Sequence, residues 1–206
     1  QLQRAREVEG KLVDLPGWTL AETSEDGIAI DRDGAGYGWF VDATPTDNCE
    51  FSQQGQVGDD LKAITGSDAE GRMDLLTVLA HEIGHVARHH PEAQMIRIAG
   101  MQVLISVATG TSGGNNASSL AGLAAILKSS RDAEREADAY AVTMLSAARI
   151  DPMALKLFLE RILKEEGKSS GSTFSNLGTV FSTHPVTTER IAQIKPLPAS
   201  AALRAP

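Results

Sequence analysis

Two patterns of hydrophobic and polar positions divide the chain near residue 66. Before that point, short strand-like runs are separated by Gly, Asp and Pro, as they are in hairpins. The runs read "LPGWTLAE", "DGIAIDRDGAG" and "YGWFVDATP". From Gly71 onward, apolar residues recur at helical spacing. The helices that this spacing predicts cover residues 71–90, 92–109, 118–128, 130–148, 152–166 and 187–194.

The order of these segments predicts an α+β fold that is mainly α. We expect residues 1–66 to form a small β-rich segment that supplies an edge strand to the rest of the molecule. Residues 67–206 are expected to form a helical body. With 206 residues, the chain is long enough to bury a real core.

Composition and charge exclude some classes of function. A formal net charge of −8 argues against a nucleic-acid partner, because such a partner selects a basic surface. The single cysteine, Cys49, excludes an internal disulfide and a zinc–thiolate cluster. We expect it to be a small buried residue; the alternative is a thiolate that caps a metal.

The sequence shows no signal peptide and no segment that should span a membrane. The longest apolar run, residues 95–110, is broken by Arg97 and Gln102 and falls short of the ~20 apolar residues that a spanning helix needs. The charged start at Gln1 indicates a processed or trimmed chain, so a removed export signal or a peripheral membrane attachment stays open.

The stretch "HEIGH" carries the first candidate chemistry. Residues four apart on a helix share a face, so His81 and His85 are placed to bind one zinc ion. Glu82 is their neighbour on the same helix and can act on a metal-activated water. The alternative is a solvated helix face. Against it, a stripe of apolar residues is expected to hold the opposite face to the core: Leu75, Leu76, Leu79, Ile83 and Val86.

A catalytic zinc also needs a third protein ligand, and two sources are possible. A third histidine in the metzincin manner is excluded, because the positions that it requires hold Arg88 and Pro91. His89 and His90 have the wrong spacing, and a continuing helix carries them past the metal as bystanders. Gly84 leaves room for a second segment to approach closely.

That second segment is the predicted helix that contains "EREAD". Glu134 and Asp138 lie on its inward face among alanines, where ionised groups need compensation. We expect Glu134 to be the third ligand and Asp138 to orient a ligating imidazole. The alternative is a surface network in which both carboxylates pair with arginines: Arg88, Arg131 or Arg135.

His184 stands in "FSTHPVTTERIAQI", where Pro185 favours an extended residue at the start of a helix. Two roles are open for this imidazole. It can hydrogen-bond the oxyanion of the tetrahedral intermediate, or occupy the open metal position and keep the enzyme latent.

Together, "HEIGH", "EREAD" and "STHP" resemble the gluzincin metallopeptidases that include the CAAX prenyl endopeptidase and the HtpX-type membrane protease. The resemblance runs from about Asp74 to Ile194. It implies a zincin-like helical body and one zinc ion per chain. It implies that zinc is bound by His81, His85 and Glu134 and that Glu82 is the general acid/base. It implies that Asp138 supports a ligand. It places His184 at the family's His-Pro position and gives Arg190 a role on the substrate side. Its soluble branch implies a periplasmic or cell-envelope location.

The resulting hypothesis is a zinc endopeptidase that cleaves protein or peptide substrates. The substrate is expected to add to the edge strand of the N-terminal segment. The rival is a chaperone-like or quality-control binding protein that retains a zinc site but is held inactive, with the loop 109–119 and His184 as the latch. A purely structural zinc site is a third, weaker interpretation. The turn at residues 32–38, with Asp31 and Asp33, leaves a calcium site open.

Overall fold

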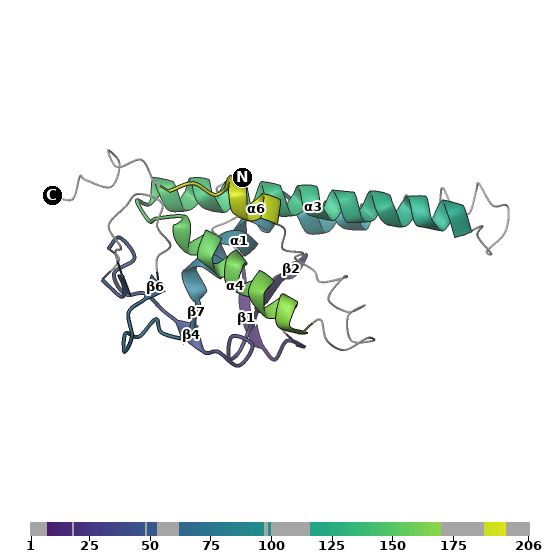
Figure 1. Ribbon diagram of the computed structural model, residues 1–206. Coiled ribbons are helices and arrows are strands. Elements are labelled where there is room, and N and C mark those ends of the chain that lie inside the picture. Colours follow the sequence, from purple (N-terminus) through teal and green to yellow (C-terminus); the bar gives the residue numbers. More distant parts are fainter. Residues whose placement is uncertain are drawn as a thin grey trace.

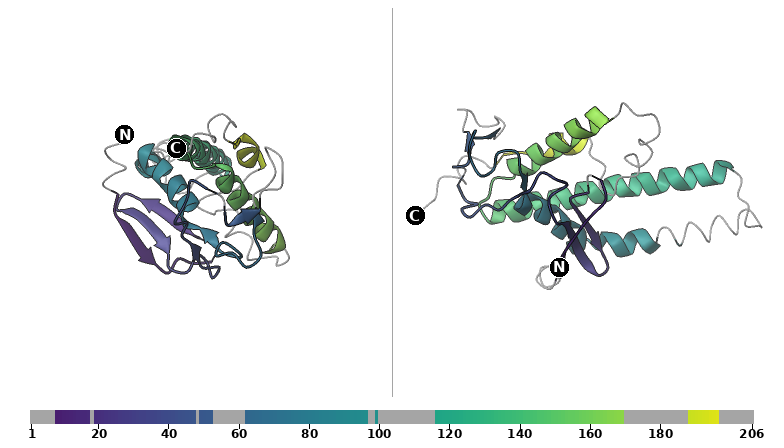
Figure 2. Two further views of the ribbon diagram at one scale, coloured as in Figure 1. Left: turned by 90° about the vertical axis from the view of Figure 1, so that its left-hand side faces the viewer. Right: turned by 90° about the horizontal axis from the view of Figure 1, so that it is seen from below.

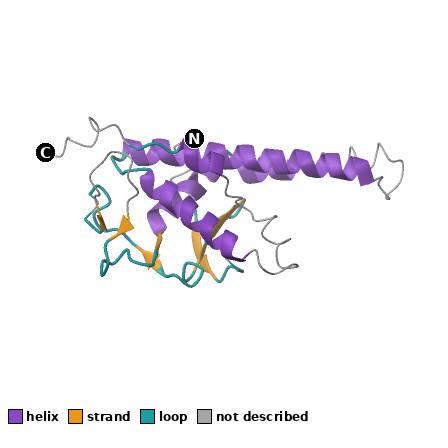
Figure 3. Cartoon of the chain, in the orientation of Figure 1, coloured by secondary structure: helices purple, strands orange, loops and turns teal. Residues whose placement is uncertain are grey.

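The structure is a computed structural model that describes residues 8–17, 19–47, 49–52, 62–96, 99, 116–169 and 188–196. Its strands are β1 (Gly10–Val13), β2 (Ala21–Ser24), β3 (Gly27–Asp31), β4 (Trp39–Phe40), β5 (Phe51–Ser52), β6 (Lys62–Ala63) and β7 (Met73–Asp74). Its helices are α1 (Leu75–Ala87), α3 (Asn116–Ala147), α4 (Met153–Ser169) and α6 (Thr188–Gln193). The strands lie on one side of the helices, so the fold is α+β and mainly α, as predicted (Figures 1 and 3).

The largest sheet contains β1, β3 and β2 in that order, and β2 is its outer strand next to α1 (Figure 2). Strands β2 and β3 pair antiparallel, with Ala21 opposite Ile30, while β1 runs parallel to β3. Gly27, after the hairpin turn, has a φ of 125°, and a Cβ there would lie 2.2 Å from the Glu9 carbonyl oxygen. Only glycine fits this close approach. The division of the chain at residues 66 and 67 stays a prediction.

Helix α1 is shorter at both ends than the 71–90 that we expected. Strand β7 occupies the residues before it and pairs parallel with β4. Asp74 then caps the helix, because its carboxylate accepts from the backbone N–H groups of Leu76 and Thr77. At the other end the helix stops at Ala87, where the next residues turn.

Helix α3 replaces the two helices that we predicted at 118–128 and 130–148. It is one helix of 32 residues, about 48 Å long at 1.5 Å per residue, and it extends past the rest of the body (Figure 1). The predicted helices at 152–166 and 187–194 correspond to α4 and α6. Of the predicted helix at 92–109, only residues 92–96 and 99 are described, and they are helical.

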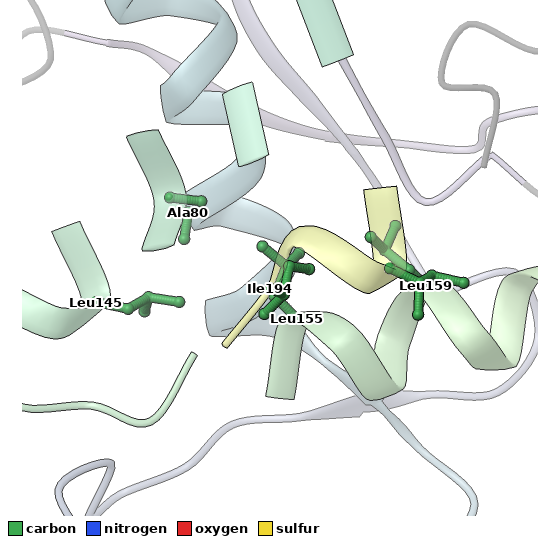
Figure 4. Close-up of a cluster of buried hydrophobic side chains, with 7 residues drawn as sticks. Ala80, Leu145, Leu155, Leu159 and Ile194 are labelled. Atoms are coloured by element: carbon green, nitrogen blue, oxygen red, sulfur yellow. The ribbon is translucent and has the colours of Figure 1, made fainter. Parts of the chain in front are cut away.

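Two apolar clusters hold the elements together. The first joins α1, α3, α4 and the end of α6 around Ala80, Leu145, Leu155, Leu159 and Ile194 (Figure 4). The second joins the sheet to α1 through Leu20, Ala21, Ile28, Met73 and Val78. Both clusters contact α1, which therefore crosses the centre of the molecule.

Helix α4 also fastens the segment that leads into α1. The guanidinium group of Arg161 donates at 2.7 Å to the carbonyl oxygens of Gly71 and Arg72. The same group lies 4.4 Å from the centre of the Tyr37 ring, in a cation–π contact.

Three further expectations can be compared with the described residues. Cys49 is exposed rather than buried. The carboxylate of Asp31 accepts from the backbone N–H groups of Leu15 and Ala35, and that of Asp33 accepts from Gly36, so both take part in the turn at 32–38; a calcium site there stays a prediction. No helix among the described residues is both long and apolar enough to cross a membrane.

Candidate metal centre

Helices α1 and α3 meet at a glycine. A Cβ on Gly84 would lie 2.6 Å from the carbonyl oxygen of Ala137 and 2.9 Å from its Cα atom. The two backbones therefore approach as closely as glycine permits, and the close approach that we expected here is confirmed. This contact places the face of α1 that carries His81 and His85 directly against the face of α3 that carries Glu134.

Three potential ligand atoms converge between the two helices. The Nε2 atoms of His81 and His85 are 3.2 Å apart, and each lies 3.3 Å from one carboxylate oxygen of Glu134. The three groups lie within 4.8 Å of one another and can hold a metal ion. All three side chains are buried, with residue exposures of 1% to 6%.

The position of the histidines in the fold differs from the expected one. The face of α1 that carries them is among its most buried parts, whereas the stripe of Leu75, Leu76, Leu79, Ile83 and Val86 is only half-buried. The reason is that α3 covers the histidine face, while the sheet and α4 cover the apolar stripe less completely.

Asp138 lies one turn after Glu134 on α3 and contacts the far side of His81. Its Oδ1 atom is 3.0 Å from Nδ1 of His81, the ring nitrogen that points away from the ligand cluster. Burial alone would lower the pKa of His81, but the hydrogen-bonding carboxylates of Asp138 and Glu134 outweigh it and raise this pKa to about 10. The metal-free site thus holds a proton that a metal ion would replace.

Arg190 of α6 closes the site from behind the carboxylates. Its Nε and Nη2 atoms donate to the two oxygens of Asp138 at 2.6 and 2.8 Å, and its Nη1 atom lies 2.9 Å from Glu134. Burial opposes the ionised form of Asp138, but Arg190 and His81 outweigh it and lower the pKa of Asp138. Arg190 is 2% exposed, so the structure places it behind the ligands rather than at an open surface.

The surface network that we weighed for these carboxylates is not the arrangement observed. Glu134 and Asp138 are buried, and their arginine partner is Arg190, which we had assigned elsewhere. Arg135 instead pairs with Asp132 and with Glu189 of α6, on the more exposed side of the helix.

Glu82 is buried beside the ligand cluster and is held by the sheet. The hydroxyl group of Thr23, in the outer strand β2, donates to the Glu82 carboxylate at 2.6 Å. It also lies 3.3 Å from the backbone oxygen of Glu82. A cleft of about 300 Å³ lies at the end of this strand and at the turn after it, and its lining includes Thr23, Ser24, Val86 and Pro91. Sequence reasoning missed Thr23, because no local signal links it to a residue 59 positions later.

Of the remaining histidines, His90 is the one that sequence reasoning placed wrongly. Its Nδ1 atom lies 3.0 Å from Nδ1 of His85, so it contacts the site instead of passing it. His89 is half-exposed and lies near Glu92. His184 lies outside the described residues.

The sequence pattern of peptidase family M48 matches residues 65–197 of the chain. Metalloprotease LoiP of Escherichia coli is 32% identical over 138 residues, which cover 61% of this chain and 52% of LoiP. The mitochondrial metalloendopeptidase OMA1 of Schizosaccharomyces pombe is 33% identical over 128 residues, which cover 61% of this chain and 36% of OMA1. The matches thus span about half of LoiP and about a third of OMA1. No solved structure matches the chain.

Proposed function

The chain belongs to peptidase family M48, and we propose on this basis that it is a zinc-dependent endopeptidase. The observation that carries the proposal is the convergence of three buried ligand atoms, from His81, His85 and Glu134, next to a buried Glu82. Protein or peptide substrates follow from the family; the activity of this chain remains the proposal.

The donor set fits one zinc ion per chain. Two imidazole nitrogens and one carboxylate oxygen form a common ligand set of catalytic zinc, which leaves a coordination position for water or substrate. When bound, zinc supplies Lewis-acid activation of water and of the scissile carbonyl group. The protein holds the three donor groups together in two ways. Gly84 lets α1 lie close against Ala137 of α3, and Arg190 forms ion pairs with Glu134 and Asp138.

Glu82 is proposed as the general base and acid. Its carboxylate accepts a proton from the attacking water and then passes it to the nitrogen of the leaving amine. The hydrogen bond from Thr23 supports this role, because it fixes the orientation of the carboxylate. Burial of Glu82 raises the strength of its interactions by keeping bulk water away.

Strand β2 is proposed to bind the substrate backbone by strand addition. It is an outer strand of the three-stranded sheet, it contacts α1, and the cleft of about 300 Å³ lies at its end, next to Thr23. A peptide that adds along this strand passes Thr23, which reaches the catalytic carboxylate. The register of cleavage would then follow from the register of strand pairing.

His184 completes the proposal as a regulatory or catalytic group. Its role rests on the family resemblance of the "STHP" motif alone. A higher peptidase activity of His184→Ala than of wild type would identify a latch, and a lower activity a group that assists catalysis. A periplasmic or cell-envelope location is proposed on the same resemblance.

The decisive experiment is Glu82→Gln in the purified full chain. We expect cleavage of a casein-type substrate to fall by about 10²–10⁴-fold, the usual contribution of a general base, while zinc content stays at one per chain. Glu160→Gln is the control, because Glu160 pairs with Lys156 on α4, away from the site. Wild-type cleavage by Glu82→Gln would contradict the role of Glu82, and absence of zinc from wild type would contradict the metal centre.

A further inference from the structure

A two-residue turn interrupts the helical path immediately after α1. Helix α1 ends at Ala87, and the N–H groups of Arg88 and His89 donate to the carbonyl oxygens of Gly84 and Val86, both at 3.1 Å. His89 then adopts a φ of 57°, in the left-handed region that ends many helices. The next helical turn begins at His90. This turn is the reason why His90 does not continue past the site as we had expected.

The turn places the His90 ring next to the ring of His85. The Nδ1 atoms of the two rings are 3.0 Å apart, and the rings meet edge to face with centroids 4.9 Å apart. The side chain of His90 is 10% exposed, and its Nε2 atom lies 3.5 Å from a carboxylate oxygen of Glu136 on α3. His90 therefore connects the back of a potential ligand to a carboxylate at the surface.

The protons in this chain of contacts can be assigned from its geometry. Nε2 of His85 faces Glu134 and His81, so it is the nitrogen that offers a lone pair to a metal. Nδ1 of His85 must then carry the hydrogen and donate it to Nδ1 of His90. The hydrogen of His90 consequently sits on Nε2, which points to Glu136. Each donor in this series meets an acceptor.

The same arrangement holds for the other histidine of the pair. Nδ1 of His81 faces Asp138 at 3.0 Å, as Nδ1 of His85 faces His90. A ligating imidazole usually has such a partner on its second nitrogen, which fixes the tautomer and the orientation of the ring. His90 is not positioned as a further metal ligand. Its Nδ1 atom contacts Nδ1 of His85, which is the ring nitrogen that points away from the three potential ligand atoms.

We propose that His90 is a positioning residue that holds the metal ligand His85 in its binding tautomer and orientation. The inference rests on the proposed zinc site. It also assigns a role to the left-handed turn at His89. Helix α3 supplies Asp138 as the partner of His81, and the turn supplies His90 as the corresponding partner of His85.

The test compares two substitutions that differ in where they place an oxygen. The amide oxygen of His90→Asn can occupy the place of Nδ1 and accept from His85. The amide of His90→Gln reaches the place of Nε2 and leaves His85 without this acceptor. His89→Asn is the control, since it removes the neighbouring half-exposed imidazole, and asparagine tolerates the left-handed conformation of this position. The measurement is the dissociation constant of zinc, by competition with a chromophoric chelator, on the full chain.

We expect His90→Gln to weaken zinc binding by about 10–100-fold, the usual effect of losing such a partner. His90→Asn should keep most of the affinity, and His89→Asn should match wild type. Equal zinc affinity in all four proteins would overturn the inference, as would an equal loss in His90→Asn and His90→Gln, because the effect would then not depend on the acceptor. If wild type itself bound no zinc, the proposed function would fail and the inference with it.

Discussion

The contact between α1 and α3 at Gly84 makes a sharp prediction for Gly84→Ala. A Cβ at this position would lie 2.6 Å from the carbonyl oxygen of Ala137, whereas ordinary van der Waals contact begins at 3.4 Å. The helices would have to separate by about 0.8 Å, because the obstacle is backbone and cannot change rotamer. Functional geometries tolerate displacements of only about 0.5 Å. The ligands on the two helices should therefore no longer converge.

Two terms set the size of the effect on stability. Overpacking typically costs about 1–3 kcal/mol, and alanine favours a helix over glycine by about 1 kcal/mol. The two terms oppose each other, so the free energy of unfolding should fall by up to about 2 kcal/mol, or up to about 8 °C in the melting temperature of a chain of this size. Zinc affinity should fall by at least about tenfold, since two ligands leave their places relative to the third.

Thermal unfolding and zinc competition measure the two effects separately. Gly10→Ala is the matched control, because a Cβ there meets only the end of the Ile30 side chain at 3.8 Å. It should leave zinc affinity unchanged. A Gly84→Ala protein with the melting temperature and the zinc affinity of wild type would refute the reasoning, because the two helices could then not be as close as the structure has them.

Three further predictions address the groups around the ligands. Arg190→Met should lower the free energy of unfolding of the metal-free protein, measured in urea, by about 3–5 kcal/mol, because it leaves two buried carboxylates without their guanidinium partner. Arg190→Lys should recover only part of this loss. A loss under about 1 kcal/mol in Arg190→Met would contradict the stabilising role of these ion pairs. The pKa of His81, raised to about 10, means that the folded metal-free protein keeps a proton that the unfolded chain releases near pH 6.5. This stabilisation is complete below pH 6.5 and is lost as the pH rises to about 10, so metal-free melting temperatures should fall over this window. Calorimetry near pH 7.5 should also detect about one proton released per zinc ion bound. Zinc binding without proton release would contradict the raised pKa of His81. Thr23→Val should lower the turnover of a peptide substrate by about tenfold without loss of zinc, since it removes a hydrogen bond to the charged Glu82 carboxylate. Thr23→Ser keeps the hydroxyl group and should restore the rate. Unchanged turnover in Thr23→Val would show that Thr23 has no part in the mechanism.

The parts of the site that lie within one helix could be predicted from the sequence. His81 and His85, and likewise Glu134 and Asp138, are four residues apart, and the period of the helix alone places each pair on one face. The inward direction of the second pair followed from the alanines around it. The structure brings the two pairs together.

The parts that depend on where a helix ends could not be predicted. Pro91 indicates that α1 cannot continue far, but nothing in the sequence marks its end at Ala87; the stop comes from the left-handed conformation of His89, a residue with no strong preference for it. The prediction therefore continued the helix to residue 90 and missed the contact of His90 with His85. In the same way, the predicted helices at 118–128 and 130–148 are separated at Ser129, whereas α3 continues through this residue, because serine is only mildly unfavourable in a helix.

The contacts of Thr23 and Arg190 depend on tertiary packing. Thr23 is 59 residues from Glu82, and Arg190 is 52 residues from Asp138. Their side chains reach the site only because β2 lies against α1 and because α6 docks on α3. No periodicity in the sequence encodes either arrangement.

The position of Arg190 near the end of the described chain has a consequence for the order in which the protein assembles during synthesis. Chains emerge from the ribosome from the N-terminus onward, so the carboxylates of α3 are made well before the guanidinium group that neutralises them. Until α6 appears, bringing Glu134 and Asp138 together would bury two carboxylates that lack the guanidinium group of Arg190 and have only His81 to neutralise them. The helices that carry the candidate metal ligands thus acquire their stable arrangement only when α6 has joined them. A chain that lacks α6 should therefore hold the candidate metal ligands less firmly than the full chain.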